Sequence, residues 1–242
     1  MNNIIVKHIP NTITSMNLLC GVLGVIASLN GRLELAFVLM ISAAAFDFCD
    51  GLAARLLKAY SEIGKELDSL ADDVSFGVLP AVMLFSVSGT DIVVLKYLPL
   101  LLAVFSALRL AKFNLDERQH DSFIGLPTPA AAMICGALAT LVTVRPDCFL
   151  AGWCEGPVFI PILTLGLCYL LVCEIPMFSM KFGGGNKVSR LEKAKRIAFL
   201  VIVGLSVIIA LVERSHWSFV FLTSFLGYVL INLVMSDFTA KK

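Results

Sequence analysis

Residues 33–89 read LELAFVLMISAAAFDFCDGLAARLLKAYSEIGKELDSLADDVSFGVLPAVMLFSVSG, two apolar stretches that a polar link separates. The stretches cover residues 33–55 and 72–89. A helix needs about 20 apolar residues to cross the hydrocarbon core of a bilayer, which is about 30 Å thick. Each stretch has close to that length, so the segment predicts two neighbouring helices that cross a membrane.

The composition of the whole chain agrees with this prediction. Of the 242 residues, 58% are apolar and 15% are charged, and the mean hydropathy is +0.89. Soluble domains carry about 45–50% apolar and about 25% charged residues. The formal net charge of +1 argues against a protein that binds nucleic acid through net basic charge, and the low charge content argues against disorder. The chain is therefore predicted to be a polytopic membrane protein.

Apolar stretches recur along the chain, and none alternates polar and apolar residues as a barrel strand does. Helices are the open-chain elements that satisfy their own backbone hydrogen bonds in lipid. We expect an all-α protein with about eight transmembrane helices. They fall near residues 13–30, 33–55, 72–89, 93–113, 128–144, 157–175, 197–213 and 217–236.

The Lys and Arg residues favour one side of this arrangement. With eight crossings, four of the nineteen basic residues face one side, and the other fifteen lie with both termini on the opposite side. The four are Arg32, Lys96, Arg145 and Arg214. Because basic residues accumulate on the cytoplasmic side, both termini are predicted to be cytoplasmic. Cys148 and Cys154 share a polar loop on the other side, where an oxidising compartment would allow them to pair.

Seven acidic residues lie between Asp47 and Asp73, at the junction of two predicted spans. Ionisable groups in membrane spans are costly and by default indicate function. Asp47 and Asp50 are three residues apart on one helix, and Asp68 and Asp72 are four apart on the next, so each pair shares a helix face. Four carboxylates brought together in this way need neutralising cations, and oxygen ligands favour Mg²⁺ or Mn²⁺.

The residues between the acidic pairs suit a phosphate ligand. Gly51 and Ala54 carry little side-chain bulk, Gly64 opens the connection, and Arg55 offers a planar fork to phosphate oxygens. Two metal ions and an arginine around a diphosphate would support displacement at phosphorus. Two other interpretations stay open at this point. The acids would pair with neighbouring basic residues at the membrane surface, or they would serve an ion-coupled carrier.

The pattern Asp47-x2-Asp50-Gly51-x2-Ala54-Arg55-x8-Gly64-x3-Asp68-x3-Asp72 resembles the signature of the CDP-alcohol phosphatidyltransferase family at every fixed position. The resemblance implies an integral membrane enzyme with a six-helix core, usually dimeric, that transfers a phosphatidyl group from a CDP-linked lipid to an alcohol and releases CMP. Residues 1–180 would form this catalytic core, 181–196 a basic cytosolic linker, and 197–242 two additional helices of the same single domain.

Further segments resemble one branch of that family, the membrane-integral phosphatidylserine synthases. They are IPNTITSMNLLCG (9–21), LDSLADDVSFGVLPA (67–81), ALRLAKFN (107–114), FIGLPTPAAA (123–132) and IPMFSMKF (175–182). The branch implies CDP-diacylglycerol and L-serine as substrates. The branch usually reads RLARFN where this chain has Lys112, which keeps the charge but loses the bidentate geometry of Arg. Glycerol phosphate, inositol phosphate or choline as acceptor, and an archaeal-type lipid donor, stay open.

Carried over position by position, the resemblance assigns roles to individual residues. Asp47, Asp50 and Asp68 would bind the first of two divalent metal ions, and Asp72 would help to hold the second and act as general base. Residues expected to contact the CDP-lipid are Gly51, Ala54, Arg55, Gly64, Thr14 and Asn17; for the last two, interhelical hydrogen bonding is the alternative. Residues expected to bind the acceptor are Arg109, Lys112 and Phe113, where Arg109 would alternatively pair with Asp73 or anchor its helix at the membrane surface.

Overall fold

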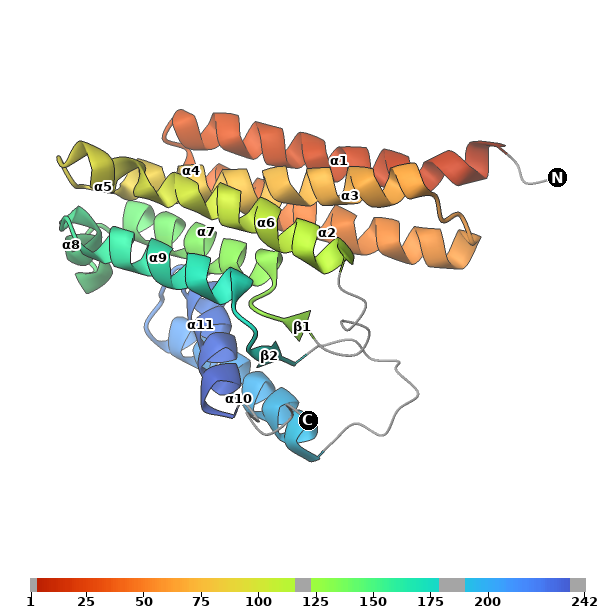
Figure 1. Ribbon diagram of the computed structural model, residues 1–242. Helices are drawn as coiled ribbons and strands as arrows, with labels where there is room; N and C mark the ends of the chain where they lie inside the picture. The colour runs from red at the N-terminus through yellow and green to blue at the C-terminus, as the bar shows by residue number, and fades with distance from the viewer. Residues whose placement is uncertain (1–3, 116–122, 179–189, 236–242) are drawn as a thin grey trace.

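The computed structural model describes residues 4–115, 123–178 and 190–235, and it is almost entirely helical (Figure 1). The first part contains α1 (Ile4–Leu29), α2 (Leu33–Leu57), α3 (Glu62–Asp73), a π-helical turn (Val74–Val78), α4 (Leu79–Val87), α5 (Val93–Tyr97), a 3₁₀ turn (Leu98–Leu100) and α6 (Leu101–Leu115). The rest contains β1 (Phe123–Ile124), α7 (Thr128–Val144), α8 (Phe149–Glu155), α9 (Phe159–Val172), β2 (Pro176–Met177), α10 (Arg190–Val212) and α11 (Ser218–Val234).

Each of the eight predicted apolar stretches contains a helix, so the all-α polytopic fold class is confirmed. Five helical segments are long and apolar enough to cross a membrane: His8–Leu29, Leu33–Leu57, Glu62–Val87, Val93–Leu115 and Arg190–Val212. Helices α7 and α8 together would make a sixth span, bent by 104°. Helices α9 and α11 are apolar but shorter. Five spans, or six with the bent pair, therefore satisfy length and composition. The count of eight crossings stays a prediction.

Helix α7 is the centre of the structure. Nearly all of its side chains are buried, and it packs against α2, α4 and α11. Its sequence TPAAAMICGALATLVTV is rich in small residues, which let helices in a membrane approach closely. A Cβ atom at Gly136 would lie 2.6 Å from the ring of Phe37 on α2, so a larger residue there would push the two helices apart.

Asp68, Asp72 and Asp73 belong to a long helical run, Glu62–Val87, which is α-helical except for one π-helical turn. The π-helical turn lies directly before α4, whose first turn contains Pro80. Proline has no backbone N–H to donate, and π-helical turns inside α-helices accommodate such local changes in hydrogen bonding. The run thereby crosses the bundle with Asp68, Asp72 and Asp73 in its first half.

Helices α10 and α11 pack together beside the core, where α11 contacts α7 (Figure 1). The predicted linker 181–196 lies partly outside the described residues, and its last seven residues already belong to α10. The short strands β1 and β2 pair antiparallel, with Ile124 opposite Pro176. Cys148 and Cys154 are free thiols in this structure.

Candidate active site

The end of α2 and the start of α3 bring the two acidic segments together. Helix α2 ends at Leu57, and Lys58 adopts a left-handed conformation (φ 50°) that lets the chain reverse. Ser61 then caps α3 by accepting a hydrogen bond from the backbone N–H of Gly64 at 3.0 Å. Serine is a favoured residue at this capping position. After the reversal α3 runs antiparallel to α2 (Figure 1), and α1 packs against both helices.

Three carboxylates converge at this junction. One oxygen from each of Asp47, Asp50 and Asp68 lies within 4.8 Å of the other two. Asp50 is 6% exposed, and its Oδ2 accepts no hydrogen bond from any described residue; the same is true of Oδ1 of Asp68. Buried polar atoms are normally paired, so these oxygens indicate that a ligand completes the cluster.

The cluster fits a divalent metal ion. Three carboxylate oxygens from two helices form the hard, negatively charged donor set that Mg²⁺ and Mn²⁺ prefer. Among the described residues, none of the three aspartates forms an ion pair with a Lys or Arg side chain. The alternative that these acids pair with basic residues at the membrane surface therefore finds no support in the structure.

Asp72 lies one helical turn after Asp68 on α3, and its hydrogen-bond partner is a residue of α1. Its Oδ1 accepts a hydrogen bond from Nδ2 of Asn17 on α1 at 3.1 Å. Asn17 is fully buried, and its backbone carbonyl accepts a hydrogen bond from the hydroxyl of Ser75 at 3.1 Å. Of the two roles weighed for Asn17, the structure therefore shows the interhelical hydrogen bond. Asp72 is held beside the three-carboxylate cluster without being a member of it.

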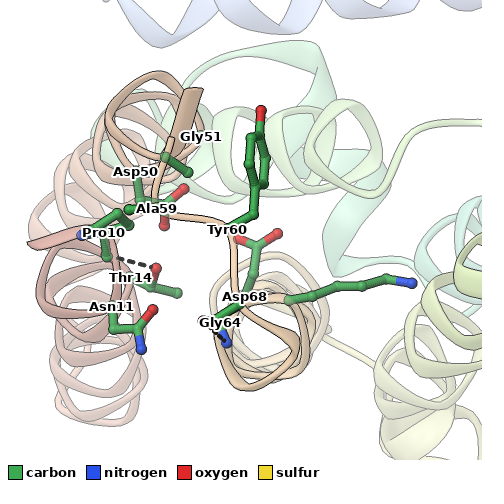
Figure 2. Close-up of a pocket in the computed structure, with 12 residues that line it drawn as sticks. Pro10, Asn11, Thr14, Asp50, Gly51, Ala59, Tyr60, Gly64 and Asp68 are labelled. Atoms are coloured by element: carbon green, nitrogen blue, oxygen red, sulfur yellow. Dashed lines mark hydrogen bonds between the residues drawn. The ribbon is translucent and has the colours of Figure 1, made fainter. Parts of the chain in front are cut away.

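A pocket of about 210 Å³ opens next to the cluster (Figure 2). Figure 2 shows Asp50 and Asp68 near one another at this pocket, with the ring of Tyr60 directed away from them. The wall includes most of the residues expected to contact a nucleotide. These are Thr14, Gly51, Ala54 and Gly64. A pocket with two carboxylates and three small residues in its wall suits a ligand that carries phosphate groups and a metal ion.

Arg55 and Asn17 do not lie on that wall. The Nε of Arg55 donates a hydrogen bond to the carbonyl oxygen of Gly51 at 3.0 Å, so the side chain folds back along its own helix. Thr14 lies on the wall, and its hydroxyl donates to the carbonyl oxygen of Pro10 at 3.0 Å.

Six further residues of the wall escaped the sequence analysis. Three of them belong to the chain reversal between α2 and α3, namely Ala59, Tyr60 and Ser61. The other three are Lys65 in the first turn of α3, and Pro10 and Asn11 on α1. Gly64 lies so close to two of these residues that an added Cβ would meet Oδ1 of Asn11 at 2.8 Å and Oγ of Ser61 at 2.9 Å. The capping signal Ser61-x-x-Gly64 precedes α3, but sequence spacing does not show which residues of α1 lie opposite it.

The three residues expected to bind the acceptor also come together. Arg109, Lys112 and Phe113 line a second, small pocket with Ile124 and the end of α9. Arg109 is 6% exposed, and its Nη1 donates to the hydroxyl of Thr128 at 2.8 Å. Its guanidinium carbon lies 5.6 Å from the centre of the Phe113 ring. Nε of Arg109 has no hydrogen-bond partner among the described residues, so this cation retains a donor for an anionic ligand.

Fold and site together define an all-α integral membrane protein with a carboxylate cluster and an adjoining pocket at one end of its helices. The family model for CDP-alcohol phosphatidyltransferases matches residues 7–169, about two thirds of the chain. The chain belongs to the CDP-alcohol phosphatidyltransferase family. Members of this family generally depend on divalent metal ions, which agrees with the donor set of the cluster.

Curated relatives agree with this assignment. The chain is 35% identical over 173 residues to a CDP-diacylglycerol–serine O-phosphatidyltransferase of Bacillus subtilis, covering 70% of this chain and 89% of the relative. It is 36% identical over 180 residues to a protein of the same name from Mycobacterium leprae, covering 71% and 58%. An archaetidylserine synthase of Methanothermobacter thermautotrophicus is 34% identical over 131 residues, covering 52% and 54%.

Proposed function

We propose that this protein transfers the phosphatidyl group of CDP-diacylglycerol to the hydroxyl of L-serine, giving phosphatidylserine and CMP. The observation that carries the proposal is the cluster of Asp47, Asp50 and Asp68 beside a pocket lined by Gly51, Ala54 and Gly64. The choice of serine rests on the names of the three relatives, since two are named as serine O-phosphatidyltransferases and the third as an archaetidylserine synthase.

The cluster would hold the first of two divalent metal ions, and Asp72 would help to hold the second. Bound Mg²⁺ or Mn²⁺ supplies positive charge that stabilises a diphosphate and its departing phosphate oxygen. The small residues of the pocket wall leave room for the nucleotide next to the helix backbone. Arg55, on the next turn of α2, would reach phosphate oxygens after releasing its hydrogen bond to Gly51.

Asp72 would act as the general base. The serine oxygen attacks the phosphorus that carries the lipid, the bond from that phosphorus to the CMP oxygen breaks, and the hydroxyl proton passes to Asp72. The hydrogen bond from Asn17 fixes one oxygen of Asp72, so the other is available to the substrate. Arg109 would bind the serine carboxylate through the donor that the structure leaves unpaired, with Lys112 and Phe113 beside it.

We further propose that the protein is a homodimer in the cell's inner membrane, with both termini and the active site facing the cytoplasm. The orientation rests on the fifteen-to-four distribution of basic residues and on serine and CMP being water-soluble. A reporter enzyme that is active only outside the cytoplasm, fused after Lys242, would then be silent. The same reporter inserted after Asp147 would be active.

The test of the proposed reaction is CMP release by the purified protein from CDP-diacylglycerol with Mn²⁺ or Mg²⁺. We expect release to require L-serine and to stop on addition of EDTA. Release with glycerol phosphate, inositol phosphate or choline instead would contradict serine as acceptor. Parallel reactions with a CDP-linked archaeal ether lipid decide the donor, since one relative is named for an archaeal lipid. An ion-coupled carrier would release no CMP under any of these conditions.

A further inference from the structure

Helix α11 forms two hydrogen bonds to Phe178, the residue that directly follows β2. Both α11 and Phe178 lie beyond residue 169, where the matched family segment ends. The hydroxyl of Tyr228 donates to the carbonyl oxygen of Phe178 at 3.0 Å. The backbone N–H of Phe178 donates to Oδ1 of Asn232 at 3.0 Å. Both polar groups of one backbone unit are therefore satisfied by side chains of α11.

These contacts are buried. Phe178, Tyr228 and Asn232 are at most 5% exposed, and Nδ2 of Asn232 donates to the carbonyl oxygen of Tyr228 at 2.9 Å. The rings of Phe178 and Tyr228 lie 4.9 Å apart, and Phe199 of α10 packs against both. Because an unpaired backbone group is costly where water is absent, Tyr228 and Asn232 fix the position of Phe178.

The position of Phe178 bears on the acceptor pocket through the two short strands. Phe178 directly follows β2, and β2 pairs with β1, whose Ile124 lines the pocket that contains Arg109. The backbone of Gly125 (φ 77°) donates to Ile175 just before β2, and the next turn begins α7 with Thr128, the hydrogen-bond partner of Arg109.

We propose that Tyr228 and Asn232 are positioning residues for the acceptor site, acting through the backbone of Phe178 on the β1–β2 pair and Arg109. Helix α11 thus supports the part of the site that selects the alcohol and leaves the metal cluster, which α2 and α3 form, unaffected. This inference rests on the proposed function, since it takes serine as the ligand of the Arg109 pocket.

The test compares steady-state kinetics of Tyr228→Phe, Asn232→Leu and Thr223→Val with those of the wild type. Loss of one buried hydrogen bond is worth roughly a fivefold to tenfold effect, so Tyr228→Phe should raise the KM for serine by about that factor. Asn232→Leu leaves the N–H of Phe178 unpaired and should raise it further. The KM for CDP-diacylglycerol and the thermal stabilisation of the protein by CDP with Mn²⁺ should stay within about twofold of wild type.

Thr223→Val is the matched control on the same helix. Its hydroxyl lies 2.8 Å from Oγ of Ser206 on α10, and its other partners among the described residues are carbonyl oxygens of its own helix. An equal rise in the KM for serine in Thr223→Val, or unchanged values in both test variants, would overturn the proposal. So would a rise in the KM for CDP-diacylglycerol of the same size as that for serine. A wild-type protein without serine-dependent CMP release would instead refute the proposed function itself.

Discussion

Asn17 of α1 donates a hydrogen bond from Nδ2 to Oδ1 of Asp72 on α3 at 3.1 Å, across 55 positions of sequence. This contact fixes the orientation of the carboxylate that we propose as general base. It also ties α1 to the acidic face of α3, next to the cluster of Asp47, Asp50 and Asp68.

Asn17→Ala should therefore lower kcat more than it changes substrate binding. Removing the hydrogen bond frees the Asp72 carboxylate to rotate, and we expect kcat to fall by about tenfold, the scale of one hydrogen bond to a charged group. Asn30→Ala is the control, because Asn30 directly follows α1 and its Nδ2 donates to the carbonyl oxygen of Ile26 on that helix at 2.8 Å. Equal kcat values for Asn17→Ala and the wild type would argue against an orienting role.

Asp72→Asn should abolish turnover while the protein still binds nucleotide. An amide keeps the size of the carboxylate but accepts no proton, and general-base catalysis is worth about 100-fold to 10,000-fold in rate. CMP release measures turnover, and stabilisation by CDP with Mn²⁺ measures binding. Asp91→Asn, an exposed residue before α5, is the control. Turnover close to the wild-type rate would remove Asp72 from the base role.

Asp50→Asn should weaken metal binding and reduce activity by at least about 100-fold, more than is usual for residues that only support a metal ligand. The buried, unpaired Oδ2 of Asp50 is one of the three oxygens at the cluster. The concentration of Mn²⁺ needed for half-maximal activity would rise accordingly. Asp147→Asn changes an exposed aspartate that pairs with Arg145, and it should leave that concentration unchanged. The same concentration in both variants would contradict the assignment of the cluster as a metal site.

Divalent metal should also stabilise the fold. An ion that binds the native state and not the unfolded chain raises the midpoint of thermal unfolding in proportion to its binding free energy. We expect Mn²⁺ to raise the midpoint of the wild-type protein by several degrees and EDTA to reverse the change. In Asp50→Asn the rise should be absent. If Mn²⁺ left the midpoint of thermal unfolding of the wild-type protein unchanged, the three carboxylates would not bind this ion.

Gly51→Ala tests whether the nucleotide occupies the pocket beside Gly51, because the added methyl group should affect ligand binding and not folding. A Cβ at Gly51 meets no atom within 4 Å, so the variant should fold and unfold like the wild type. Its methyl group would occupy pocket space, and binding of CDP should weaken by about tenfold or more, the cost of a modest steric conflict in a fitted site. Gly204→Ala, whose Cβ on α10 likewise meets nothing, should leave binding unchanged. Normal CDP affinity in Gly51→Ala would place the nucleotide elsewhere.

The fold class and the centre of the site followed from the sequence because both depend on local spacing. The apolar stretches set the helices, and the intervals of three and four residues place each aspartate pair on one helix face. The structure accordingly brings Asp47, Asp50 and Asp68 together. The separation of Asp72 from this cluster was harder to foresee, since it depends on how α3 is rotated against α2 and α1.

Lengths and boundaries were predicted less well. Helices α9 and α11 are shorter than the apolar stretches that predicted them, and the sharp bend between α7 and the short helix α8 was not expected. The predicted linker 181–196 extends into α10. Apolar composition marks a segment for burial or for lipid, but where a helix bends or stops depends on the neighbours that satisfy its end groups.

The sequence by itself determined an all-α membrane protein of the CDP-alcohol phosphatidyltransferase family, because hydropathy and the spacing of eight motif residues are properties of the chain alone. Only the tertiary structure decided which partners those residues have. Asn17 hydrogen-bonds to Asp72, Arg109 to Thr128, and Phe178 to Tyr228 and Asn232. Such pairs lie between 19 and 55 positions apart and form when helices pack, and packing depends on the rotation and depth of every helix at once.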